Sequence, residues 1–91
     1  MQIGSKNLTV DGYVDSTNAT RVFAVIIKSG GTAAVVGFAN IQAGTEYDSV
    51  AGTINTTVIR SYPGGLLFPG GCYVDVDANT TYVTVIYARE S

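Results

Sequence analysis

The side chains that could do chemistry in this chain are carboxylates, tyrosines and one thiol, because the sequence contains no histidine. Histidine is the commonest general base and the commonest metal ligand of proteins. Its absence excludes Ser-His-Asp and Cys-His catalytic arrangements within the chain. Cys72 has no second cysteine with which to form an internal disulfide. We therefore expect Cys72 to be a small buried hydrophobic residue and not a nucleophile.

Two pairs of carboxylates have members that lie two residues apart. Glu46 and Asp48 fall in a stretch that reads as a loop, and Asp75 and Asp77 fall on one face of an expected strand. A glycosidase needs two carboxylates on either side of a cleft. Nothing in the sequence places these pairs opposite one another, so we expect them to be solvated acids.

A short acidic stretch, Asp75-x-Asp77-x-Asn79, is similar to the opening of a calcium-binding loop. The similarity then ends, because Thr80 stands where that loop needs glycine and Ile86 where it needs glutamate. A strand that runs into a hairpin turn is the preferred interpretation, and a weak cation site at a subunit contact is the alternative. The glycine pairs at 30–31, 64–65 and 70–71 lack the following helix that a phosphate site needs. We expect no catalytic residue, no metal site and no cofactor.

Tyrosines are the remaining candidates for ligand contact, since their rings can line a carbohydrate-binding or peptide-binding surface. More often such rings pack across strands or between subunits, with the hydroxyl at the rim. We expect the second arrangement and keep the first as the alternative. The six tyrosines are Tyr13, Tyr47, Tyr62, Tyr73, Tyr82 and Tyr87.

Charge is sparse, at 13% of the 91 residues, while 46% of them are hydrophobic. A typical domain is about a quarter charged, and a small domain cannot bury this much apolar surface alone. We therefore predict a homo-oligomer. The net charge is −2 and the basic residues are scattered, which argues against nucleic acid as a partner. They are Lys6, Arg21, Lys28, Arg60 and Arg89.

No segment of the sequence has the features of a membrane span or a secretory signal. The apolar run that contains Phe23–Ile27 is far shorter than the roughly 20 residues that cross a bilayer. The first ten residues lack a charged region leading into an apolar run. We expect a soluble protein that is made in a cytoplasm and has no membrane partner.

Local sequence patterns predict strands throughout, because Val, Ile, Thr and Tyr dominate and Gly, Asn, Asp and Pro interrupt them at short intervals. We predict one all-β domain over residues 1–91, a β-sandwich or jelly roll of about seven short antiparallel strands. Residues 1–10 are expected to form an extended N-terminal arm. The clearest strands are Leu8–Val14, Arg21–Lys28, Ala33–Ile41, Thr53–Tyr62, Cys72–Asp77 and Thr81–Ala88.

The connections are predicted from their glycines, prolines and polar residues. Ser29–Thr32 reads as a hairpin turn, and Gln42–Gly52 reads as an acidic loop. Two Pro-Gly-Gly turns, which begin at Pro63 and Pro69, bracket the apolar segment Leu66-Leu67-Phe68. Such a segment between two turns is a candidate for contact with another subunit.

The chain resembles small all-β proteins of tailed bacteriophages. In that pattern, an apolar strand with a Gly-Gly turn precedes a polar loop, a glycine-bracketed apolar segment and a final strand. The corresponding pieces are Val22–Thr32, Gly64–Val76 and Val83–Tyr87. The opening, from Ile3–Lys6 through Asp11–Val14, is also similar. The resemblance implies a virion structural protein, such as a capsid decoration or cement protein, and carries no functional residue with it.

The functional hypothesis is therefore a non-enzymatic virion protein, made in the host cytoplasm. We expect it to self-associate, for example as a trimer, and to bind the major capsid protein or other virion proteins. The alternative is a tail, baseplate or fibre module that recognises carbohydrate or protein, and an enzyme is the third hypothesis. The expected contact residues are Leu8, Val10, Leu66, Leu67 and Phe68.

Overall fold

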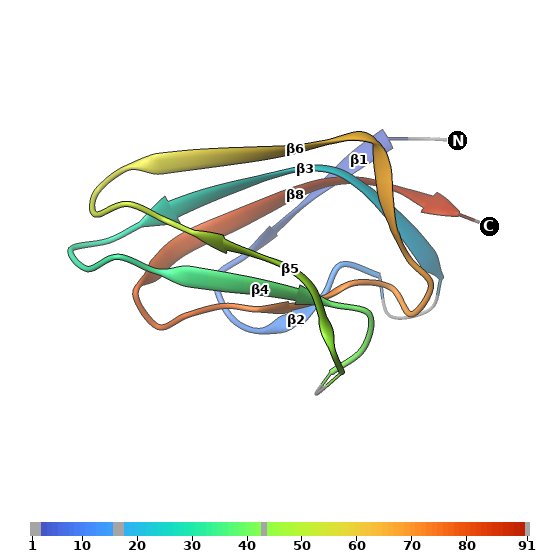
Figure 1. Cartoon of the computed structure of the whole chain (residues 1–91), viewed down its shortest axis with the longest axis horizontal. Helices are drawn as coiled ribbons and strands as arrows, with labels where there is room; N and C mark the ends of the chain where they lie inside the picture. Colours follow the sequence, from blue (N-terminus) through green and yellow to red (C-terminus); the bar gives the residue numbers. More distant parts are fainter. Residues whose placement is uncertain (1–2, 16–17, 43, 91) are drawn as a thin grey trace.

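The chain folds into two stacked antiparallel sheets, and its described residues include no helix (Figure 1). A computed structural model describes residues 3–15, 18–42 and 44–90. The predicted all-β fold is confirmed, with eight strands, slightly more than expected. They are β1 (Ile3–Leu8), β2 (Gly12–Tyr13), β3 (Ala19–Ser29), β4 (Val35–Ala39), β5 (Glu46–Ala51), β6 (Thr57–Phe68), β7 (Tyr73–Asp75) and β8 (Thr80–Glu90).

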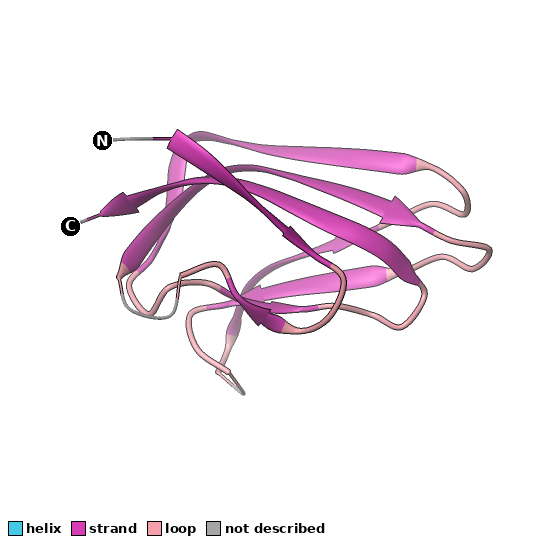
Figure 2. Ribbon diagram, turned by 180° about the vertical axis from the view of Figure 1, so that it is seen from behind, coloured by secondary structure: helices cyan, strands magenta, loops and turns pink. Residues whose placement is uncertain are grey.

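Strand pairing in the two sheets is nested. Sheet A has the order β1-β8-β3-β6, and sheet B has the order β2-β7-β4-β5. β1 pairs with β8, β2 with β7, β3 with β6 and β4 with β5, so the chain follows one long hairpin that is rolled into two layers (Figure 2). Two further pairings complete the sheets: β3 with β8 in sheet A, and β4 with β7 in sheet B. This arrangement of eight strands is a jelly roll, one of the two predicted architectures.

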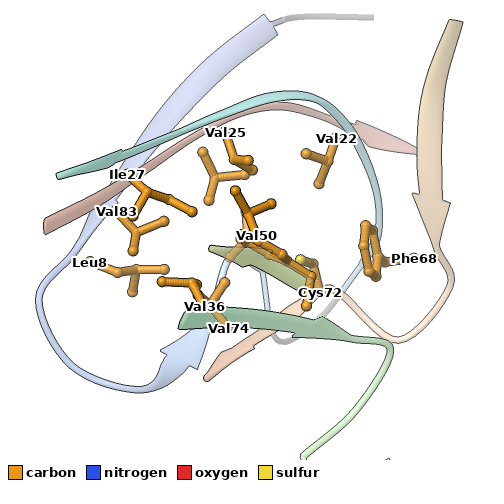
Figure 3. Close-up of a cluster of buried hydrophobic side chains, with 13 residues drawn as sticks. Leu8, Val22, Val25, Ile27, Val36, Val50, Phe68, Cys72, Val74 and Val83 are labelled. Atoms are coloured by element: carbon orange, nitrogen blue, oxygen red, sulfur yellow. The ribbon is translucent and has the colours of Figure 1, made fainter. Parts of the chain in front are cut away.

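The core lies between the sheets (Figure 3). Inward and outward side chains alternate along the strands except where the pairing shifts register, as between Val22 and Ala24 of β3. Val25 and Ile27 of β3 point into it from sheet A, and Val36 and Val74 point into it from sheet B. Each is fully buried. Burial of one such side chain stabilises the fold by about 1.5–3 kcal/mol.

The predicted N-terminal arm is wrong for Ile3–Leu8. These residues form β1 and pair with β8 along their whole length, from Ile3 opposite Ala88 to Leu8 opposite Val83. Ile3 and Leu8 are the only apolar side chains of this segment, so no alternation identifies a strand, and the partner that selects it is remote in sequence. Residues 1 and 2 lie outside the described part of the chain.

Two predicted connections also differ from the structure. The expected loop Gln42–Gly52 contains β5, an edge strand whose polar residues hide its periodicity. The expected hairpin at Ser29–Thr32 is wrong, because β3 lies in sheet A and β4 in sheet B. This segment carries the chain from one sheet to the other.

The first Pro-Gly-Gly sequence is not a turn but part of β6. Gly64 and Gly65 have φ angles of 79° and 85°, and the pairing of β3 with β6 shifts register at this level. Pro63 is accommodated because β6 is an edge strand. The strand bends sharply here (Figure 1), which directs Phe68 into the core.

Three of the four edge strands carry a charged residue at a position that faces the core by register. Lys6 of β1 lies opposite Val85, Arg60 of β6 opposite Val25, and Asp48 of β5 opposite Phe38. The fourth edge strand, β2, has two residues. Inward-pointing charges and short edge strands both hinder pairing of an edge with another chain.

Candidate functional site

The outer face of sheet A is poor in charged residues. Register places four side chains in each row across its strands, and its two middle rows contain no charged residue. Ile59 of the edge strand β6 is 65% exposed in one of them. The rows are Ser5–Ile86–Ala24–Ser61 and Asn7–Thr84–Ile26–Ile59.

Two cations flank these rows on β3, the strand between β8 and β6. Arg21 lies opposite Leu67 on one side, and Lys28 lies opposite Thr57 on the other. The Arg21 guanidinium donates to the carbonyl oxygen of Gly64 at 3.5 Å. The Lys28 ammonium donates to the carbonyl oxygen of Asn55 at 3.3 Å. Both contacts are exposed, so the outer face of sheet A is apolar and hydroxyl-bearing with positive ends.

The outer face of sheet B has the opposite character. Asp75 of β7 lies opposite Gly37 of β4, and Glu46 of β5 lies opposite Ala39 in the next row. The Glu46 side chain covers Gly37, where a Cβ would overlap its carboxylate. Two carboxylates therefore share the middle of this face, and the nine outward positions of its paired strands include no lysine or arginine. These positions are Tyr13, Val35, Gly37, Ala39, Glu46, Ser49, Ala51, Tyr73 and Asp75.

An aromatic pair stands beside these carboxylates. Tyr13 and Tyr73 lie opposite one another on β2 and β7, with ring centroids 5.0 Å apart at an angle of 70°. The Tyr13 hydroxyl accepts a hydrogen bond from the Gln42 backbone N–H at 3.0 Å. The pKa of Tyr73 is raised by desolvation and then by the nearby carboxylates of Asp11 and Asp75. The pair is a fixed, partly exposed aromatic surface in a negative field.

A shallow hollow of about 410 Å³ opens beyond Asp75, where the β1–β2 and β7–β8 connections meet. The two carboxylates that line it, Asp11 and Asp77, accept hydrogen bonds from backbone N–H groups. Asp77 accepts from the N–H groups of Asn79 at 2.8 Å and Val35 at 3.2 Å, and these bonds lower its pKa. Asp11 accepts from the Val76 N–H at 2.6 Å.

Among the residues that the structure describes, no group of three or more acids, histidines or cysteines could hold a metal ion. Of the preferred interpretation of the calcium-like stretch, the strand is present as β7, but the hairpin is wrong, because the turn after β7 leads to β8 in the other sheet.

A polar cluster of Asp48, Arg60 and Tyr62 links the edge strands β5 and β6, which belong to different sheets. The Tyr62 hydroxyl donates to Oδ2 of Asp48 at 2.5 Å, and Arg60 donates to the same oxygen at 2.9 Å. Burial and the bond to Asp48 raise the pKa of Tyr62 above its ordinary value. The Arg60 side chain is 47% exposed, so its ion pair with Asp48 contributes little. The hydrogen bond from Tyr62 is the stronger link between the sheets at this edge.

Replacing Asp48 with asparagine is expected to lower the free energy of unfolding by about 1–2 kcal/mol, because the tyrosine bond loses its charged acceptor. Urea denaturation of Asp48→Asn, Tyr62→Phe and the double variant measures the coupling between them. Ser49→Ala, on the other face of the same strand, is the control. Strictly additive effects of the two substitutions would contradict this link.

Cys72 is a core residue, and its surroundings do not activate the thiol. It is fully buried, its φ angle is 62°, and burial raises its pKa from 9.0 to about 12. The expected role as a buried hydrophobic residue agrees with this position.

The Cys72 thiol should make the fold less stable in alkali. Between pH 9 and pH 12 the unfolded chain loses a proton that the folded chain keeps. The free energy of unfolding should therefore fall as pH rises through this window, by up to about 1.4 kcal/mol per pH unit. Tyr62 adds a loss in the same direction at higher pH. Denaturation below and above pH 9 should show a shallower decline for Cys72→Ala than for the natural chain, and equal slopes would contradict the assignment.

The five expected contact residues do not lie on one surface. Leu8 and Phe68 are core residues, 8% and 1% exposed, and Leu66 packs against the core. Val10 is 70% exposed beside the hollow, and Leu67 lies on the outer face of sheet A. Intersubunit contact stays a prediction for all five, but burial within the chain gives Leu8 and Phe68 a structural role that needs no partner.

The sequence did not reveal which residues share these outer faces. The alternation of Thr57, Ile59 and Ser61 indicates an outer face for β6, but only strand order puts Ile59 beside Ile26. The pairing of Tyr13 with Tyr73 likewise follows from the nested topology. The chain matches no family model, and neither curated proteins nor solved structures gave a match. Among the described residues there is no helix of the length and apolarity needed to cross a membrane.

Proposed function

We propose that this chain is a non-enzymatic structural protein of a virion, a capsid decoration or cement protein that self-associates and binds the shell surface. The observation that carries the proposal is the outer face of sheet A. Its uncharged middle rows expose isoleucines and hydroxyl side chains on a four-stranded sheet. Specific interfaces are depleted of charge at their centres in the same way.

The fold and the sequence resemblance support the same proposal by analogy. Jelly rolls serve as viral capsid domains and also as lectins, so the architecture fits a shell component without requiring one. The sequence pattern resembles small proteins of tailed bacteriophages. Asp48 and Cys72 both have structural roles, since Asp48 accepts a hydrogen bond from Tyr62 and Cys72 is buried in the core.

The test is to ask whether the protein is part of a virion and how many copies it contributes. Particles purified from a culture in which the gene is expressed during infection would be analysed by quantitative mass spectrometry. We expect a copy number in a fixed ratio to the major capsid protein, and release by conditions that leave the shell intact. Absence from purified particles would overturn the proposal.

A carbohydrate-binding module of a tail, baseplate or fibre is the second candidate, and the Tyr13–Tyr73 pair favours it. A half-buried aromatic pair beside Asp11 and Asp75 offers a stacking surface and hydrogen-bond acceptors for sugar hydroxyls. A glycan array with the natural chain and Tyr73→Ala tests this candidate. Tyr82→Ala, on the outer face of sheet A, is the matched control.

A further inference from the structure

The two broad faces of this molecule differ in charge. The outer face of sheet A carries Arg21 and Lys28 on its third strand, at either end of its uncharged rows. The outer face of sheet B carries Glu46 and Asp75 at its middle, on the two sides of Gly37 and Ala39. Apolar or aromatic side chains accompany the charges on both faces, as they do in specific interfaces.

We propose that the outer face of sheet A of one copy packs against the outer face of sheet B of a second copy. The proposal rests on the self-association included in the proposed function and names the surfaces that carry it. A second copy is the partner, because its acidic face complements the cations of the first. Its acidic face offers carboxylates to Arg21 and Lys28, and it offers the Tyr13–Tyr73 pair as an aromatic surface for a cation.

Other ways of pairing two copies are less favourable. Sheet A against sheet A brings four cations into one interface, and sheet B against sheet B brings four carboxylates together. Like charges across an interface cost several kcal/mol. Edge-to-edge pairing is hindered by the core-facing charges of Lys6, Asp48 and Arg60.

The dimensions of the faces suit an interface of ordinary size. The Cα atoms extend over 39 × 25 × 17 Å. A broad face of this extent can supply the roughly 800 Å² per partner of a standard interface. Because the two surfaces differ, the contact is heterologous and repeats from copy to copy, in a ring or in an open row.

Charge reversal on single faces tests the proposal. Lys28→Glu reverses a charge only on the outer face of sheet A, and Asp75→Lys reverses a charge only on the outer face of sheet B. Each variant alone is expected to lower the self-association constant at least tenfold, measured by light scattering and sedimentation at low salt. Lys6→Glu makes the same charge change as Lys28→Glu, at a position that lies on neither outer face, and should self-associate as strongly as the natural chain. Circular dichroism confirms that the variants are folded.

Mixing the two variants gives the decisive result. Each keeps the face that the other has lost, so an equimolar mixture should form at least one-to-one pairs, and high salt should weaken them. A monomeric natural chain, unaffected single variants, or a mixture that stays monomeric would each overturn the proposal. If the natural chain is monomeric in solution but present in virions, the packing of sheet A on sheet B is overturned, while the proposed binding to the shell is retained. Loss of association in Asp75→Lys alone would indicate a symmetric contact through sheet B instead.

Discussion

Replacing Phe68 with alanine is expected to lower the free energy of unfolding by about 3–5 kcal/mol. Its ring is 1% exposed and stacks on Tyr47 with a centroid separation of 5.0 Å, at the point where the bent end of β6 enters the core. Small domains have a total stability of about 5–15 kcal/mol. The variant should therefore be close to the limit of folding, with a much lower midpoint in urea denaturation.

Leu67→Ala provides the matched control for this prediction. Leu67 is the preceding residue of the same strand, points to the other side of the sheet and is 37% exposed. Its loss should lower the free energy of unfolding by less than about 1 kcal/mol, since much of the side chain is already in water. Equal effects of the two substitutions would show that Phe68 is not a core residue.

A Gly71→Ala variant should lose about 2–4 kcal/mol of stability, from backbone strain and overpacking together. Gly71 has a φ angle of 102°, and a Cβ there would overlap the carbonyl group of Asp15. The Asp15 N–H donates to the carbonyl oxygen of Gly71 at 3.0 Å, so the two segments cannot separate without losing this bond. Thermal denaturation followed by circular dichroism would measure the loss.

Gly64→Ala separates the two causes. Gly64 also has a positive φ angle, 79°, but a Cβ there would meet no atom within 4 Å. Its substitution should therefore cost only the conformational part, about 1 kcal/mol. A Gly71 variant that is no less stable than the Gly64 variant would show that the contact with Asp15 can relax.

Local patterns were sufficient to predict the fold class because strands in a two-layer protein alternate. Val74 faces the core while Tyr73 and Asp75 face outward, as the sequence indicates. Alternation does not specify partners. The edge strand β5 escaped detection because Asp48 occupies a core-facing position and forms a polar link to β6 instead of packing.

The candidate surfaces were less predictable for the same reason. Leu8 and Phe68 are apolar residues beside turn-like sequences, a pattern that fits a contact loop and a core position equally well. Whether the side chain points inward depends on the bend at Pro63 and on the pairing of β1 with β8. Both depend on residues far apart in sequence, so neither can be read from a local window.

The nested pairing also determines when the fold can form. β4 and β5 are the only consecutive strands that pair directly among the described residues, and each outer pair must close a longer loop. β8 lies between β1 and β3, so sheet A cannot assemble until β8 has left the ribosome. Until then the most apolar strand, β3, lacks one neighbour. We expect folding to begin at β4–β5, to be slow for a domain of this size and to finish only when β8 joins sheet A.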